Sequence, residues 1–189
     1  MQIYLIDDYC FKIKGRSTTV VIGRVRKNTF DAQADIIIDR DQVRDYKKNS
    51  DSFLINAPGE YEISGVSVFS RKNFSIVEID EVRFCYLRIS EVDLSEKEIE
   101  EVEGIDILLI CLNQSDKEGN KALKIVNQIQ PCLVLLADQK EVEQFVKKLN
   151  LEAVKREKKL TINKSDLPDE EMEVVILEGK NGSSQNSSS

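Results

Sequence analysis

Two apolar runs in the second half of the chain restrict the folds that this sequence can adopt. Residues 105–112 (IDILLICL, apolar apart from Asp106) and 132–137 (CLVLLA) are short and bounded by turn or helix signals, which is typical of buried strands. A helix is predicted over 118–129, because its apolar residues recur at helical spacing and a proline follows it. A second amphipathic helix is predicted over 138–149, with Asp138 as its N-cap.

The first half of the chain is predicted to form short strands rich in β-branched and aromatic residues, interrupted by one helix that begins with a capping box at Ser95 and Glu98. These strands are expected at 2–6, 10–14, 18–22, 36–38, 53–56, 61–63, 66–69, 74–79 and 82–87. A sheet-rich half followed by a half that alternates helix and strand predicts an α/β or α+β fold. Two sheets facing each other, with helices on their outer faces, would bury all of these runs.

One strand ends abruptly in charged residues. Residues 36–38 are three isoleucines, and the next seven positions hold the charged side chains Asp39, Arg40, Asp41, Arg44 and Asp45. A strand that leaves the core and delivers acidic residues into a loop is a common way to build a metal or catalytic site. The segment 34–46 is therefore the first candidate for a functional site.

This segment resembles the metal-binding strand end of the metallo-β-lactamase fold hydrolases, where an apolar strand precedes the pattern His-x-His-x-Asp-His. The two leading histidine positions fall on Asp41 and Val43, the aspartate position on Asp45, and the last histidine position on Tyr46. Only the aspartate is kept, and the chain contains no histidine.

The resemblance continues in order along residues 1–138. Residues 7–11 (DDYCF) are similar to the family's Gly-His-Ser-Cys-Phe turn, with Asp8 at the position of its histidine, and the run 58–63 (PGEYEI) is the most specific match. The family's metal-bridging aspartate falls on Ile89 and its final histidine on Asp138. The resemblance implies a four-layer αββα sandwich, which we predict for a single domain over 1–178.

The residues at these positions predict that zinc is not bound. The family activates water with Zn²⁺ held mainly by imidazole, and neither Val43 nor Ile89 can replace such a ligand. Two interpretations remain open for the aspartates at or beside the metal positions, which are Asp8, Asp41, Asp45 and Asp138. They could hold Mg²⁺ or Ca²⁺, which prefer oxygen ligands. Alternatively, three arginines supply the positive charge in a salt-bridged, metal-free pocket, namely Arg40, Arg44 and Arg88.

Composition excludes several classes of function. Lys plus Arg total 27 and Asp plus Glu total 34, and the resulting net charge of −7 argues against nucleic-acid and anionic-membrane binding. No apolar run approaches the roughly 20 residues that span a bilayer, and no signal peptide is predicted. The four cysteines are far apart and lie in apolar runs, so we expect free thiols in a reducing cytoplasm.

These observations predict a cytoplasmic pseudoenzyme with the metallo-β-lactamase fold, a lost zinc site and no catalytic residues. Its role would be to bind or scaffold a protein partner that the sequence does not identify. Two alternatives are a hydrolase that uses a carboxylate site for Mg²⁺, Ca²⁺ or Mn²⁺, and a sensor that binds a small ligand in the vestigial cleft.

The last residues, 179–189, contain only Gly, Lys, Asn, Ser and Gln, and we predict a disordered polar tail. Deleting 179–189 should change the free energy of unfolding by less than about 0.5 kcal/mol, because disordered residues make no stabilising contacts. Urea denaturation of the full chain and the truncated chain measures this difference. A larger loss would show that the tail packs on the domain.

Overall fold

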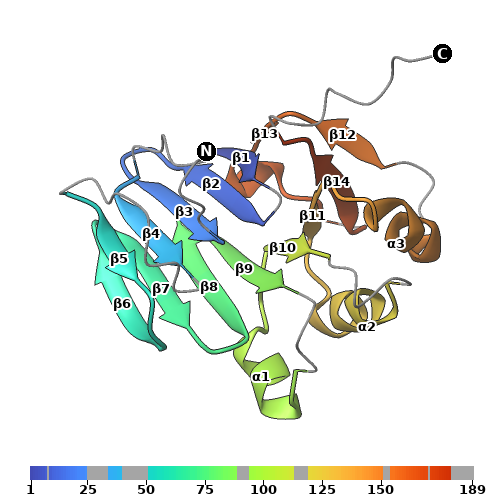
Figure 1. Cartoon of the computed structure of the whole chain (residues 1–189), viewed down its shortest axis with the longest axis horizontal. Helices are drawn as coiled ribbons and strands as arrows, with labels where there is room; N and C mark the ends of the chain where they lie inside the picture. Colours follow the sequence, from blue (N-terminus) through green and yellow to red (C-terminus); the bar gives the residue numbers. More distant parts are fainter. Residues whose placement is uncertain are drawn as a thin grey trace.

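The computed structural model describes residues 1–7, 9–24, 34–39, 51–88, 94–112, 119–150, 154–169 and 171–179, with the backbone alone at Arg88. Within these ranges the strands form two mixed sheets that lie face to face, and the α-helices lie on one side of the pair (Figure 1). We call them sheet A and sheet B.

Sheet A contains most of the first third of the chain. Its strand order is β13-β1-β2-β3-β4-β5, in which β1, β2 and β3 are antiparallel neighbours, and β3, β4 and β5 run parallel. The short strand β13 pairs with β1, so that Gln2 lies opposite Thr161 and a strand from the last third of the chain joins sheet A. The strands are β1 (Gln2–Asp7), β2 (Cys10–Lys14), β3 (Thr19–Gly23), β4 (Ile36–Asp39), β5 (Phe53–Ile55) and β13 (Leu160–Thr161).

Sheet B joins the hairpins of the first half to the alternating second half. Its order is β12-β14-β11-β10-β9-β8-β7-β6, antiparallel from β6 to β9 and parallel from β9 to β12. Two-residue turns at 64–65 and 80–81 have positive φ at both positions, which matches the twist of a hairpin. The strands are β6 (Gly59–Ile63), β7 (Val66–Ser70), β8 (Phe74–Ile79), β9 (Val82–Arg88), β10 (Ile107–Cys111), β11 (Leu133–Ala137), β12 (Lys155–Glu157) and β14 (Glu173–Leu177).

The alternation of side chains in sheet B explains why its central strands are apolar throughout. In β9, Phe84 and Tyr86 point into the layer between the sheets, whereas Cys85 and Leu87 point to the opposite face. All four are buried, and the five residues of β10 and of β11 are buried as well. A strand that is covered on both faces has no position for a polar side chain. This agrees with the apolar runs at 105–112 and 132–137, which predicted buried strands.

The outer face of sheet B is covered by helices. These are α1 (Glu96–Glu101), α2 (Asn120–Ile129) and α3 (Val142–Leu149), and a 3₁₀ turn, η2 (Lys164–Asp166), follows β13. In α2 the buried residues lie at helical spacing, and in α3 Val142 and Phe145 are buried against the same cluster. The predicted capping box of α1 is present, because Ser95 Oγ accepts a hydrogen bond from the Glu98 N–H and Glu98 accepts one from Ser95 N.

The predicted mixed α/β sandwich is therefore confirmed. Two sheets share one apolar layer, and helices form a third layer on sheet B. The described residues place no α-helix on sheet A, and the fourth layer expected there stays a prediction. None of the helices in the described ranges has the length and hydropathy needed to cross a membrane.

Candidate functional site

The parallel strands of both sheets direct their carboxyl ends to one edge of the sandwich. Ligand sites in sheets of this kind lie beyond the carboxyl ends of the strands. In sheet A these ends carry Gly23 and Asp39, and in sheet B they carry Arg88, Cys111 and Asp138. The hydroxyl of Tyr86, from sheet B, donates a hydrogen bond of 3.0 Å to the carbonyl of Tyr9, in the turn between β1 and β2. This contact joins the two sheets at that edge, which is the candidate site.

Four residues form a row across sheet A at this edge. The pairing register places Asp7 opposite Cys10, Cys10 opposite Gly23, and Gly23 opposite Asp39. Asp7, Cys10 and Asp39 are buried. The row therefore brings two carboxylates and a thiol to the end of the sheet, with a gap at Gly23, which has no side chain.

Only glycine fits the third position of the row. Gly23 has φ of +126°, and a Cβ atom there would lie 2.0 Å from the carbonyl oxygen of Tyr9. The same carbonyl accepts the N–H of Arg24 at 2.9 Å in addition to the Tyr86 hydroxyl. Two donors and the close approach of Gly23 thus fix the turn between β1 and β2.

The electrostatic environment keeps the Cys10 thiol neutral. Burial is the largest effect that raises the pKa of Cys10 well above its ordinary value, and Cys111, Asp7 and Asp39 raise it further. A protonated thiol is a poor nucleophile and a poor metal ligand. The expectation of free thiols holds, since none of the four cysteines forms a disulfide, with Cys132 half-buried and the other three buried.

Asp138 is the one predicted site residue whose side chain the structure describes. It follows β11 and pairs with Arg156 of β12, with 3.0 Å between Oδ1 and Nη1, while the other terminal nitrogen of Arg156 contacts Glu143 of α3. The prediction that Asp138 is an N-cap is wrong, because α3 begins at Val142 with Glu141 as its N-cap. The aspartate instead accepts a hydrogen bond from Arg156.

The other predicted site positions lie outside the described residues. They are Asp8, Asp41, Val43, Asp45, Tyr46 and Ile89, together with Arg40, Arg44 and the side chain of Arg88. The proposed contacts between these arginines and Asp41 or Asp45 therefore stay predictions. Sequence reasoning missed Asp7, Cys10 and Asp39 as a set, because only the strand register reveals that they lie in one row.

A search of solved structures identifies the fold. The chain aligns with a protein from Thermotoga maritima described as a "putative Zn-dependent hydrolase of the metallo-beta-lactamase superfamily", with a TM-score of 0.80 and 20% identity. The alignment covers 94% of this chain and 99% of that one. No protein-family model and no curated protein matches the sequence. The chain therefore has the metallo-β-lactamase fold.

Imidazole, a common ligand of zinc in proteins, is not available in this chain. The whole chain lacks histidine, and the described residues contain no group of three or more Cys, Asp or Glu side chains placed to hold a metal ion. The backbones of Asp7 and Asp39 lie three strand spacings of about 4.8 Å apart in the pairing register, so the two residues are not neighbours in sheet A.

The close approach at Gly23 predicts a large cost for adding a methyl group. Gly23→Ala should destabilise the protein by about 3 kcal/mol or more, because the backbone is strained and Cβ collides with a carbonyl oxygen. Gly65→Ala is the matched control, since Gly65 has φ of +76° with no atom within 4 Å of its Cβ, and should cost about 1–2 kcal/mol. Chemical denaturation measures both. Equal costs would contradict the contact with Tyr9.

The raised pKa of Cys10 predicts a loss of stability in alkali. The folded thiol stays neutral while the unfolded thiol ionises, so its contribution to stability is complete below the unfolded pKa and declines as pH rises. The difference in unfolding free energy between the parent and Cys10→Ala should fall by about 1 kcal/mol from about pH 8.5 to about pH 9.5. Urea denaturation at several pH values tests this. Parallel pH curves would show that the folded environment does not suppress ionisation.

Proposed function

We propose that this chain is a catalytically inactive protein with the metallo-β-lactamase fold, which has lost the zinc site and binds or scaffolds a protein partner. The observation that carries the proposal is the absence of histidine from all 189 residues. Hydrolases of this fold depend on imidazole-bound zinc to generate hydroxide near neutral pH. Without imidazole, neither that centre nor a Ser-His or Cys-His nucleophile can form.

The chemistry of the candidate edge supports the same conclusion. The Cys10 thiol is held in its neutral form, so it does not provide an activated nucleophile. The Asp138 carboxylate is paired with Arg156, so that a positive charge already balances it. Both side chains are partly exposed, and an ion pair of this kind contributes no more than about 1 kcal/mol of stability. The main effect of the pair is therefore to neutralise the Asp138 carboxylate, and its contribution to the stability of the fold is small.

A hydrolase built on carboxylates is the second candidate, and the buried carboxylates of Asp7 and Asp39 are the observation in its favour. They are not neighbours in sheet A, because three strand spacings separate their backbones. Such a site would need Asp41 and Asp45. If the protein is inactive, we expect these aspartates to pair with arginines instead. Magnesium and calcium must therefore be included in any metal test.

We predict that zinc does not stabilise the protein. A ligand present at 100 times its dissociation constant adds about 2.7 kcal/mol, which a melting experiment detects readily. The untagged protein should keep its melting temperature in micromolar zinc, in millimolar magnesium or calcium, and after treatment with a chelator. Elemental analysis should find no stoichiometric metal.

The outcomes of this experiment separate the candidates. A stoichiometric zinc ion whose removal abolishes hydrolysis of phosphoester or amide substrates would overturn the proposal. Stabilisation by magnesium or calcium alone, with hydrolysis that depends on the ion, would favour the carboxylate hydrolase.

A further inference from the structure

The strand β6 ends sheet B, and no described strand pairs with its outer edge. Ser64 and Gly65 form a two-residue turn with positive φ at both positions, so the flanking residues Ile63 and Val66 form a hydrogen-bonded pair. Hydrogen-bonded pairs alternate along an antiparallel ladder, which places Tyr61 in the next one. The backbone N–H and C=O groups of Glu60 and Glu62 therefore point away from β7, toward the free edge.

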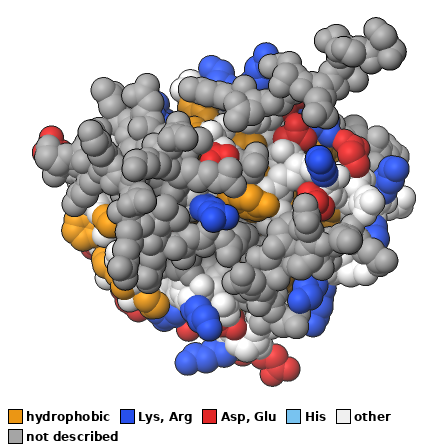
Figure 2. All heavy atoms as spheres, in the orientation of Figure 1, with side chains coloured by type: hydrophobic (Ala, Val, Ile, Leu, Met, Phe, Trp, Pro, Cys, Tyr) orange, Lys and Arg blue, Asp and Glu red, His pale blue; other side chains and the backbone are white. Residues whose placement is uncertain are grey.

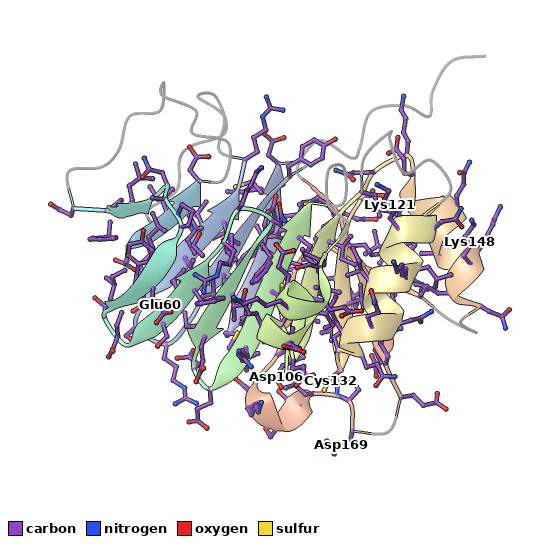
Figure 3. The ribbon with its side chains drawn as sticks, turned by 90° about the horizontal axis from the view of Figure 1, so that it is seen from below. Glu60, Asp106, Lys121, Cys132, Lys148 and Asp169 are labelled. Carbon is purple, nitrogen blue, oxygen red and sulfur yellow. The ribbon has the colours of Figure 1, made fainter. Side chains whose placement is uncertain are left out.

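The outer face beside this edge is an acidic groove. It has a volume of about 360 Å³, and its lining includes Glu60, Glu62, Glu78, Arg83, Phe69 and Ile76. Three carboxylates face one guanidinium, and Arg83 already donates to the carbonyl of Glu103 at 2.6 Å. Glu60 lies at the end of the molecule away from the helices that carry Lys121 and Lys148 (Figure 3). A side chain entering the groove next to β6 therefore meets an excess of negative charge.

The opposite face of β6 is apolar. Tyr61 packs edge to face on Phe53 of β5, with ring centroids 6.3 Å apart, where the two sheets end side by side. Phe53 is 45% exposed, and it is the only large hydrophobic residue in the described part of the chain that is classed as exposed. Hydrophobic side chains are visible at the surface over β5 and β6 in Figure 2. A strand added to β6 would cover this aromatic pair.

We infer that the free edge of β6 is a docking site for an extended segment of a partner protein, in which basic residues alternate with apolar ones. The segment adds a strand to sheet B by bonding to the backbone of Glu60 and Glu62. Successive side chains of a strand point to opposite faces. Its lysines or arginines then lie beside the carboxylates of the groove, and its apolar residues lie on Phe53 and Tyr61.

A second copy of this chain is a poor occupant of the same edge. Antiparallel pairing of two β6 strands about Tyr61 would place Glu60 of each copy opposite Glu62 of the other. Like charges directly opposite in a sheet are destabilising, and charged side chains are a common protection of edge strands against self-association. The charge pattern thus selects a basic partner over self-pairing. The inference rests on the proposed binding role and supplies a class of partner for it. The geometry of the β6 edge does not depend on whether the protein binds a metal ion.

The direct test uses a synthetic, end-capped peptide of alternating lysine and valine, seven residues long, with fluorescence anisotropy as the readout. It should bind the full chain about tenfold more tightly than the matched peptide with glutamate in place of lysine. In antiparallel addition, the lysines lie opposite Glu60 and Glu62 and exchange hydrogen bonds with them. A lysine–valine peptide that is N-methylated on its lysines cannot donate to the carbonyls of Glu60 and Glu62, and should also bind about tenfold more weakly. This second comparison separates strand addition from attraction by net charge.

Variants of the protein locate the site. Glu62→Lys should weaken binding of the lysine–valine peptide about tenfold, whereas Glu157→Lys, an equal charge change on the exposed strand β12 at the other end of sheet B, should leave it within about twofold. Glu62→Pro removes the outward N–H as well as the charge, and a proline is tolerated on an edge strand at that position. It should bind less tightly than Glu62→Gln, which keeps the N–H.

The proposal is overturned if N-methylation has no effect, if Glu62→Lys and Glu157→Lys weaken binding equally, or if the protein dimerises through β6. If a variant does not fold, the comparison of the two peptides on the parent protein remains decisive. Zinc-dependent hydrolysis would refute the proposed inactivity without changing these peptide results, and peptide failure would leave the metal result unchanged. The two proposals therefore fail separately.

Discussion

The burial of one apolar layer between two sheets is the constraint on which the rest of the molecule depends. Every strand of sheet A and sheet B that contributes to this layer must present alternate side chains to it. The central strands of sheet B must also present apolar side chains to the helices on their other face. In β10 and β11, which are covered on both faces, all five residues are buried and apolar, and polar groups come only beyond the strand ends. The candidate edge carries Asp7, Asp39 and Asp138 at or directly after the ends of their strands.

Local sequence patterns predicted the elements but not the relations between them. The strands of sheet B were evident because a run such as LVLLA is compatible only with burial on both faces. The start of α3 was misplaced, because Asp138 and Glu141 have capping spacing, whereas the Asp138 carboxylate is engaged by Arg156 from a strand 18 residues away in the chain. The row through Cys10 and Gly23 depends on register between separate strands, which no local pattern encodes. Most of the vestigial positions, from Asp41 to Tyr46, lie outside the described residues.

The proposed inactive site and the proposed binding surface lie in different parts of this fold. The carboxyl ends of the parallel strands would hold a metal in an active relative, and here they carry a neutral thiol and an ion-paired aspartate. The antiparallel end of sheet B lies at the other side, where β6 combines a free backbone edge, three carboxylates and an exposed aromatic ring. A scaffold whose chemistry is absent can keep a recognition surface there, because edge pairing needs backbone groups and not catalytic side chains.

The pairing of β1 with β13 has a consequence for how the protein is made. Gln2 and Thr161 are neighbours in the sheet although almost the whole chain separates them, and the amino group of Met1 donates to the carbonyl of Ile162 at 2.9 Å. A ribosome delivers the first strand long before its partner, and contacts of such high sequence separation are slow to form. The outer edge of β1 therefore stays unpaired until residues 160–161 have been synthesised, which exposes it to chaperone binding and to aggregation during translation.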